Sequence, residues 1–389
     1  MNAETGGYHK EVTIVQAAPQ QACGCVCPSP FERPEWYALL ADSRPHAFFK
    51  RVETGGSHAT IALNRTDGRI EALRNWYAFT WRPVVPAGEA GDAMLEALAR
   101  DLKREAPRVT LWPLPDEDGS ATRLAAAFRK AGWQVSLTQC DENHVLPVAG
   151  RSFAEYWATR PGRLRTTLKR KAKKVEVEIV EHFDAKLWAD YENIYAESWK
   201  PSEDEPDLLR RFAQDEGAAG RIRLGVARAD GVAVAAQFWT VENGIAYIHK
   251  LAHLESAKPI SPGTTLSAAL FEHVIDRDNV TLVDFGTGSD SYKADWMEQV
   301  RPRFLLDALD PPLGLRSRNA QRARSLQEAT PPARQPRLLR QLNGIYDRPD
   351  FSACGPDRAR PQQDRRDPAR NPARRTRPVG RTRRRPDAR

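Results

Sequence analysis

The predicted secondary structure has the same order in both halves of the chain, which restricts the folds that the chain can adopt. In the first half, alternating apolar and polar residues predict a strand over 58–64, and Asp67-Gly68 predicts a hairpin turn into a strand over 69–80. The pattern then predicts, in order, a helix over 90–104, a strand over 109–114, a helix over 121–131 and a strand over 133–137. Antiparallel strands followed by crossover helices are typical of a mixed α/β sheet.

The second half repeats this order with a longer series of elements. Apolar residues at Leu164, Leu168, Ala172 and Val175 predict one face of a helix. The pattern that follows predicts a strand over 175–180, helices over 185–199 and 207–216, strands over 222–229, 232–241 and 244–254, a helix over 264–276, a strand over 280–285, a short helix over 292–297 and a strand over 304–309. The sequence therefore predicts an α/β fold of two similar mixed sheets flanked by helices.

Composition separates the ends of the chain from its body. Residues 1–35 are rich in Gly, Pro, Gln and Cys without a sustained period, and we expect a flexible leader there. Two α/β domains are predicted over 36–150 and 151–315. Residues 316–346 have an Arg- and Leu-rich helical pattern, and residues 347–389 have too few apolar residues to offset the entropy of ordering, which predicts a disordered tail.

The positive charge of the chain is confined to this tail. The whole chain of 389 residues has a formal net charge of +8, with 59 Lys and Arg against 51 Asp and Glu. Residues 347–389 hold 14 Arg and 6 Asp and neither Lys nor Glu, which accounts for the entire excess. Because the body is neutral, its overall charge does not indicate a nucleic-acid partner.

Hydropathy and the first residues favour a cytoplasmic protein without a membrane span. The mean hydropathy is −0.61, and no apolar run approaches the roughly 20 residues that cross a bilayer. The start of the chain lacks the charged and apolar regions of a secretory signal. Cys23, Cys25 and Cys27 do not have the spacing of zinc ligands, and we expect no metal.

Two turns in the second half carry residues suited to chemistry. Ser261-Pro262-Gly263-Thr264 opens an apolar helix, whose free N–H groups and dipole suit a phosphate, although a plain N-cap explains the same residues. The strand before Gly286 ends at Asp284, and ligands of open α/β sheets collect beyond strand ends. A structural Asp284 that caps the following Gly-Thr-Gly turn is the alternative.

With these residues in place, residues 152–309 resemble the GNAT superfamily of acyl-CoA N-acyltransferases, in particular its CelD-like branch of cellulose and polysaccharide biosynthesis. The resemblance rests on the segments RPGRLRTTLKRKAKK, YIHKLAH, SPGTTL and VDFGTGSDSYKADW. It implies two GNAT-like mixed sheets in tandem, as in the related Fem-type peptidyltransferases, with a degenerate first domain and the acyltransferase site in the second. The pattern [QR]-x-x-G-x-[GA] of most GNAT enzymes is reduced here to the four residues from Ser261 to Thr264.

The resemblance also implies the roles of individual residues. The acyl donor would be acetyl-CoA or another acyl-CoA, and the acceptor an amine on a small molecule or a glycan. Asp284 or His249 would take the amine proton, Tyr292 would protonate the leaving thiolate, and Lys293 would pair with Asp284 or with a substrate carboxylate. The residues implied in donor binding are Ser261, Pro262, Gly263, Thr264 and Thr265, with the backbone of Leu251 and Ala252 holding the oxyanion.

A basic segment over 163–174 is expected to bind an anion or to form a solvated face. It has seven basic residues in twelve, among them Arg165, Lys169 and Lys173 at i, i+4 and i+8. The anion would be the CoA phosphates, an anionic glycan or nucleotide sugar, or tRNA. Two other functions stay open: a nucleic-acid-binding protein that uses this segment and the tail, and a GNAT scaffold without activity.

Overall fold

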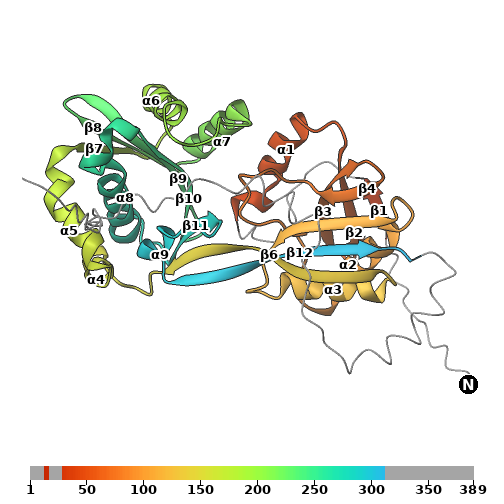
Figure 1. Cartoon of the computed structure of the whole chain (residues 1–389). Coiled ribbons are helices and arrows are strands. Elements are labelled where there is room, and N and C mark those ends of the chain that lie inside the picture. The colour runs from red at the N-terminus through yellow and green to blue at the C-terminus, as the bar shows by residue number, and fades with distance from the viewer. Residues whose placement is uncertain (1–12, 17–28, 312–389) are drawn as a thin grey trace, which may run out of the picture. The chain divides into compact units, whose positions relative to one another are not determined.

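The computed structural model describes residues 13–16 and 29–311. The predictions for 316–346 and for the tail over 347–389, and the cysteines at 23, 25 and 27, lie outside the described residues. Within them, the mixed α/β fold with helices flanking the sheet is confirmed (Figure 1).

All strands of the described residues form one mixed sheet in the order β1-β2-β3-β4-β5-β12-β6-β11-β10-β9-β8-β7. The strands are β1 (Thr13–Gln16), β2 (Ala47–Thr54), β3 (Ser57–Thr66), β4 (Arg69–Ala72), β5 (Arg108–Leu114), β6 (Gln134–Pro147), β7 (Glu176–Val180), β8 (Ile222–Ala229), β9 (Val232–Glu242), β10 (Ile245–His253), β11 (Leu282–Thr287) and β12 (Gln299–Leu309). Neighbouring strands are antiparallel except for the pairs β4–β5 and β10–β11, which are parallel.

Helices cover both faces of this sheet (Figure 1). They are α1 (Pro34–Asp42), α2 (Gly88–Leu102), α3 (Ser120–Lys130), α4 (Phe153–Ala158), α5 (Gly162–Lys171), α6 (Ala185–Ala196), α7 (Pro206–Ala218), α8 (Pro262–Glu272) and α9 (Lys293–Trp296), with 3-10 turns η1 (Pro30–Glu32), η2 (Ala172–Lys174) and η3 (Glu255–Ile260). In the second half, α6 and α7 pack on one face of the strands in one apolar cluster, and α8 packs on the other face in a second cluster.

Several elements differ from the prediction. Part of the predicted leader is ordered: α1 starts at Pro34, a favoured first helical residue, and buries Trp36 and Leu40. The strand predicted over 69–80 ends at Ala72, because Asn75 accepts the Tyr77 N–H through its side chain (3.1 Å) and turns the chain. Strands β6 and β12 are much longer than predicted.

The long strand β12 connects the two halves. It lies between β5 and β6 and is antiparallel to both, while the C-terminal end of β6 also pairs with β11. The sheet is therefore continuous from the first half to the second, and the boundary between residues 150 and 151 stays a prediction.

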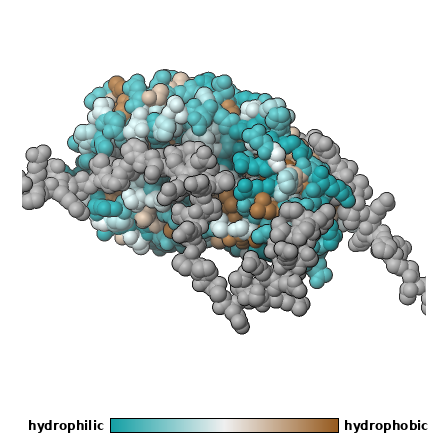
Figure 2. Space-filling view, turned by 45° about the vertical axis from the view of Figure 1, so that its right-hand side comes forward, coloured by the Kyte–Doolittle hydropathy of each residue, from teal (hydrophilic) through white to brown (hydrophobic). Residues whose placement is uncertain are grey.

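The surface in Figure 2 is mostly hydrophilic, with apolar residues in small patches. Across residues 13–16 and 29–311, no helix combines the length and the apolar character needed to cross a membrane.

Candidate functional site

The two parallel strands β10 and β11 separate soon after they pair. Their register joins Ile245–Tyr247 to Leu282–Asp284 and goes no further. Beyond that point β10 stays paired with β9 through an irregularity between Ile248 and Lys250, and β11 stays paired with β6. The sheet therefore opens beyond the pair formed by Tyr247 and Asp284, where ligands of open α/β sheets bind.

Backbone groups of β10 face this opening. The Leu254 N–H donates to Val234 O (2.9 Å) at the end of the ladder with β9. Because donors alternate along an antiparallel ladder, the Ala252 N–H also points to β9, whereas the Leu251 N–H points to the side that β11 has left. Of the two residues predicted to hold an oxyanion, Leu251 is the one whose N–H is directed there.

Helix α8 starts beside the opening with an unusual first residue. Ser261 occupies the N-cap position with a left-handed backbone (φ 51°, ψ 52°), and its side chain makes no capping hydrogen bond. Its Oγ instead accepts a hydrogen bond from Lys171 Nζ at 2.9 Å. Pro262 occupies the first turn, and a Cβ on Gly263 would lie 3.4 Å from the His253 ring.

Two threonines continue this first turn. Thr264 is partly buried, and the buried Thr265 Oγ1 has no hydrogen-bond partner within the described part of the chain. The turn therefore combines backbone donors that a helix start leaves unsatisfied with one ammonium and an unused hydroxyl, a donor set that fits a phosphate.

Not all basic residues of the segment over 163–174 face the start of α8. Helix α5 ends at Lys171, so Lys173 lies in η2 and the predicted row of three charges is broken. Arg165 and Lys169 are exposed, and Arg165 donates from Nε to Arg160 O (3.0 Å). Lys171 of this segment donates a hydrogen bond to Ser261 at the start of α8, a contact that the charge pattern alone does not distinguish.

Asp284 is buried, with 6% of its surface exposed, and its carboxylate is fully engaged. It accepts the Gly286 N–H (2.7 Å) and the Asn143 Nδ2 (3.1 and 3.0 Å). Burial raises the pKa of Asp284 above its ordinary value, although the Arg303 guanidinium and these hydrogen bonds act against the shift. The predicted cap of the Gly-Thr-Gly turn is thus present, and a raised pKa also suits a proton acceptor.

Lys293 contacts the loop that follows β11, and its pairing with Asp284 or with a substrate carboxylate stays a prediction. The Lys293 side chain is buried, and its Nζ donates to Thr287 O (2.5 Å) and Gly288 O (3.2 Å). It also lies 3.8 Å from Asp290 Oδ2. Lys293 therefore holds the loop that follows β11.

Tyr292 lies next to this loop, before α9. Its ring is partly buried and meets Phe285 edge-on, with 5.5 Å between the ring centroids. This position keeps Tyr292 close to the end of β11.

His249 lies among aromatic rings of the apolar cluster that contains α6 and α7. The rings of Phe31, Phe79, Phe212 and Phe238 lie within 5.8 Å of its centroid, and its Nε2 is 2.8 Å from Thr240 Oγ1. Burial, followed by the nearby Lys250 and Arg33, lowers the pKa of His249 to about 3. An imidazole with so low a pKa is a weak proton acceptor at neutral pH.

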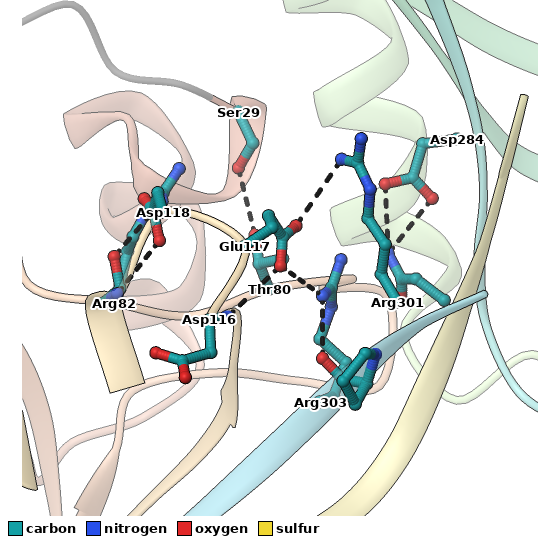
Figure 3. Close-up of polar contacts among 12 residues, drawn as sticks. Ser29, Thr80, Arg82, Asp116, Glu117, Asp118, Asp284, Arg301 and Arg303 are labelled. Carbon is teal, nitrogen blue, oxygen red and sulfur yellow. Dashed lines mark hydrogen bonds and ion pairs between the residues drawn. The ribbon is translucent and has the colours of Figure 1, made fainter. Parts of the chain in front are cut away.

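A network of ion pairs fixes first-half residues next to Asp284 (Figure 3). Arg303 of β12 is 1% exposed and donates from Nη1 to Glu117 Oε2 at 2.9 Å, while Arg301 lies 3.6 Å from the other oxygen of Glu117. Nearby, Thr80 Oγ1 donates to Glu32 Oε1 (2.9 Å). Sequence reasoning missed Asn143 and Arg303, because neither belongs to a local motif.

The comparisons with known proteins agree with this geometry. Residues 162–294 match the family model of an acetyltransferase (GNAT) domain. The fold is GNAT-like. The crystal structure of FemX has a TM-score of 0.54 at 11% identity, over 73% of this chain and 93% of that chain, a likeness that shows the fold alone.

Two further solved structures are similar at lower scores. The C-terminal domain of a putative lysylphosphatidylglycerol synthetase from Agrobacterium fabrum has a TM-score of 0.49 at 14% identity, over 74% of this chain and 91% of that chain. A tandem GNAT protein from the clavulanic acid biosynthesis pathway has a TM-score of 0.46 at 15% identity, over 78% and 99%. No curated protein sequence matches the chain.

The described residues hold no group of three or more His, Cys, Asp or Glu that could bind a metal ion.

Proposed function

We propose that the chain is an N-acyltransferase that moves an acetyl or other acyl group from acyl-CoA to an amine. The observation that carries the proposal is the opening between β10 and β11 beside the start of α8, within the residues that match a GNAT domain. We further propose a CelD-like role, with an amine acceptor on an envelope polysaccharide or related precursor. This finer role rests on the resemblance of residues 152–309 to the CelD-like branch.

The start of α8 would hold the phosphates of the donor. The free N–H groups of its first turn and the Lys171 ammonium both favour negative charge there. The donor supplies a thioester, whose carbonyl carbon forms the new bond to the amine nitrogen as the carbon–sulfur bond breaks. The Leu251 N–H would donate to the carbonyl oxygen as that oxygen gains charge.

Two side chains would move protons. Asp284 is the better proton acceptor of the two candidates, since the pKa of Asp284 is raised and that of His249 is lowered to about 3. Tyr292 would donate a proton to the leaving thiolate. Lys293 would keep the loop between them in place through its bonds to Thr287 O and Gly288 O.

Calorimetry with acetyl-CoA tests donor binding. We expect Lys171→Met to weaken binding about tenfold, because the ammonium that lies beside Ser261 could no longer donate a charge-assisted hydrogen bond to the donor phosphate. Lys169→Met is the matched control on the same helix, since Lys169 is exposed, and its affinity should stay within about twofold of wild type. Absent acetyl-CoA binding together with tight, salt-sensitive RNA binding would instead support the nucleic-acid-binding alternative.

Release of free thiol in the presence of a panel of amines tests turnover. We expect Tyr292→Phe to lower kcat at least tenfold without changing the thermal stability, because the ring and its contact with Phe285 are kept while the acid is removed. An unchanged kcat would remove Tyr292 from the mechanism. Acetyl-CoA binding without turnover on any amine would favour the inactive scaffold.

A further inference from the structure

A buried lysine lies in a cage of aromatic rings. The Lys250 side chain is 3% exposed, and its Nζ is 2.9 Å from Glu203 Oε1. The same Nζ lies over the rings of Trp76 at 3.5 Å, Tyr77 at 4.3 Å and Tyr195 at 5.3 Å. We call Trp76, Tyr77, Tyr195 and Glu203 the ammonium cage.

The carboxylate of the cage is held in place by hydroxyl groups. Tyr77 Oη donates to Glu203 Oε1 at 2.6 Å, and Tyr191 Oη lies 3.3 Å from Oε2. A desolvated carboxylate facing ring π-systems is the chemistry that recognises an ammonium ion. The site selects a primary alkylammonium on an unbranched chain, since that is the group that Lys250 presents.

The cage is assembled from separate parts of the chain. Trp76 and Tyr77 come from the first half, Tyr195 lies in the last turn of α6, and Glu203 lies in the connector between α6 and α7. The last carboxylate of the connector, Glu205, is fixed by Arg44 (2.9 and 3.1 Å) and by Asn75 Nδ2 (2.9 Å). The first half therefore helps to build a site against β10 of the second half.

The cage lies beside the opening of the sheet. Lys250 follows the irregularity in β10, where the register with β9 passes from Ile248↔Trp239 to Lys250↔Phe238. The stretch from Tyr247 to Lys250 thus leads directly from the last residue paired with β11 to the cage. Lys250 directly precedes Leu251, to whose N–H the proposed function assigns the acyl carbonyl.

We propose that the ammonium cage binds the protonated amine of the acceptor, and that the Lys250 ammonium occupies the cage until the acceptor displaces it. The inference rests on the proposed function, since an amine acceptor is a primary ammonium at neutral pH before it loses its proton. The flexible four-carbon stem of lysine permits the exchange. Competition from Lys250 lowers the apparent affinity of the acceptor.

Calorimetry with n-propylammonium chloride on the full chain, without acyl-CoA, tests the cage. The atoms that Lys250→Ala removes have the size of this probe. We expect saturable binding to the wild type and at least tenfold tighter binding to Lys250→Ala. Adding Glu203→Gln to Lys250→Ala should abolish that binding. Lys200→Ala is the matched control, because Lys200 Nζ faces the Tyr195 ring from 5.9 Å outside the cage, and its affinity should equal that of the wild type.

Two results would overturn the proposal that a ligand displaces the Lys250 ammonium. One is that n-propylammonium does not bind the wild type saturably, and the other is that it binds wild type and folded Lys250→Ala with equal affinity. In either case the Lys250–Glu203 pair would be a permanent structural bridge. Thermal unfolding reports whether each variant is folded. If Lys250→Ala does not fold, Trp76→Leu is used instead. We expect Trp76→Leu to weaken n-propylammonium binding at least fivefold, and an unchanged affinity would overturn the proposal. The n-propylammonium assay contains no acyl-CoA. Its result can therefore be interpreted even if acetyl-CoA does not bind in the donor-binding test.

Discussion

Replacing Gly286 by alanine is expected to lower the free energy of unfolding by about 3 kcal/mol. Gly286 has φ +71°, a conformation that costs an L-residue energy. In addition, its Cβ would lie 2.7 Å from Cε1 of Phe79, a buried first-half residue. The Gly286 N–H also donates a hydrogen bond to Asp284, the candidate proton acceptor, so the substitution should disturb this bond as well. Urea unfolding measures the loss.

A second glycine separates the two causes. Gly231 has φ +79° with nothing within 4 Å of the position of a Cβ, so Gly231→Ala should cost only about 1 kcal/mol. The double variant Gly286→Ala/Phe79→Leu should lose less than the sum of the single variants, because leucine gives the new methyl group room. Equal losses for Gly231→Ala and Gly286→Ala would show that the contact with Phe79 does not restrict the turn.

Replacing Arg303 by methionine is expected to lower the free energy of unfolding by about 3 kcal/mol. Arg303 is almost fully buried, and its guanidinium binds Glu117 at 2.9 Å (Figure 3). Methionine fills a similar volume but leaves the Glu117 carboxylate without this partner. Since Arg303 also counteracts the raised pKa of Asp284, we expect that pKa to rise further in the variant.

Arg301 is the matched control for Arg303. It shares the Glu117 carboxylate at a longer distance of 3.6 Å, and its side chain is 29% exposed. Water compensates for the loss of such a pair, so Arg301→Met should cost no more than about 1 kcal/mol. Similar losses for the two variants would show that burial does not decide the strength of this network.

Local sequence patterns were sufficient to predict most of the second half. The turns Asp230-Gly231 and Asn243-Gly244 have positive φ at both residues, as hairpin turns require, and join β8, β9 and β10 where predicted. The helix after Ser261 and the strand ending near Asp284 were also predicted. These features depend on neighbouring residues, whose periodicity and turn chemistry are visible in the sequence.

Contacts between distant residues could not be predicted in this way. Nothing near Lys171 indicates that it reaches Ser261, and nothing near Asn143 indicates that it binds Asp284. The charge pattern favoured Arg165, Lys169 and Lys173 as anion-binding residues, because their spacing predicts one helical face. In the structure they do not share a face, because α5 ends at Lys171.

By itself, the sequence determined the order of most strands and helices, although not β2, α1 or α4, and it also determined the hairpins and the turns at which chemistry could occur. These features follow from short-range periodicity and backbone preferences. Only the tertiary structure placed β12 between β5 and β6 and brought Trp76 and Tyr77 to Glu203 and Lys250. Strand order and side-chain contacts across more than a hundred residues depend on how the whole sheet packs, and no local pattern encodes them.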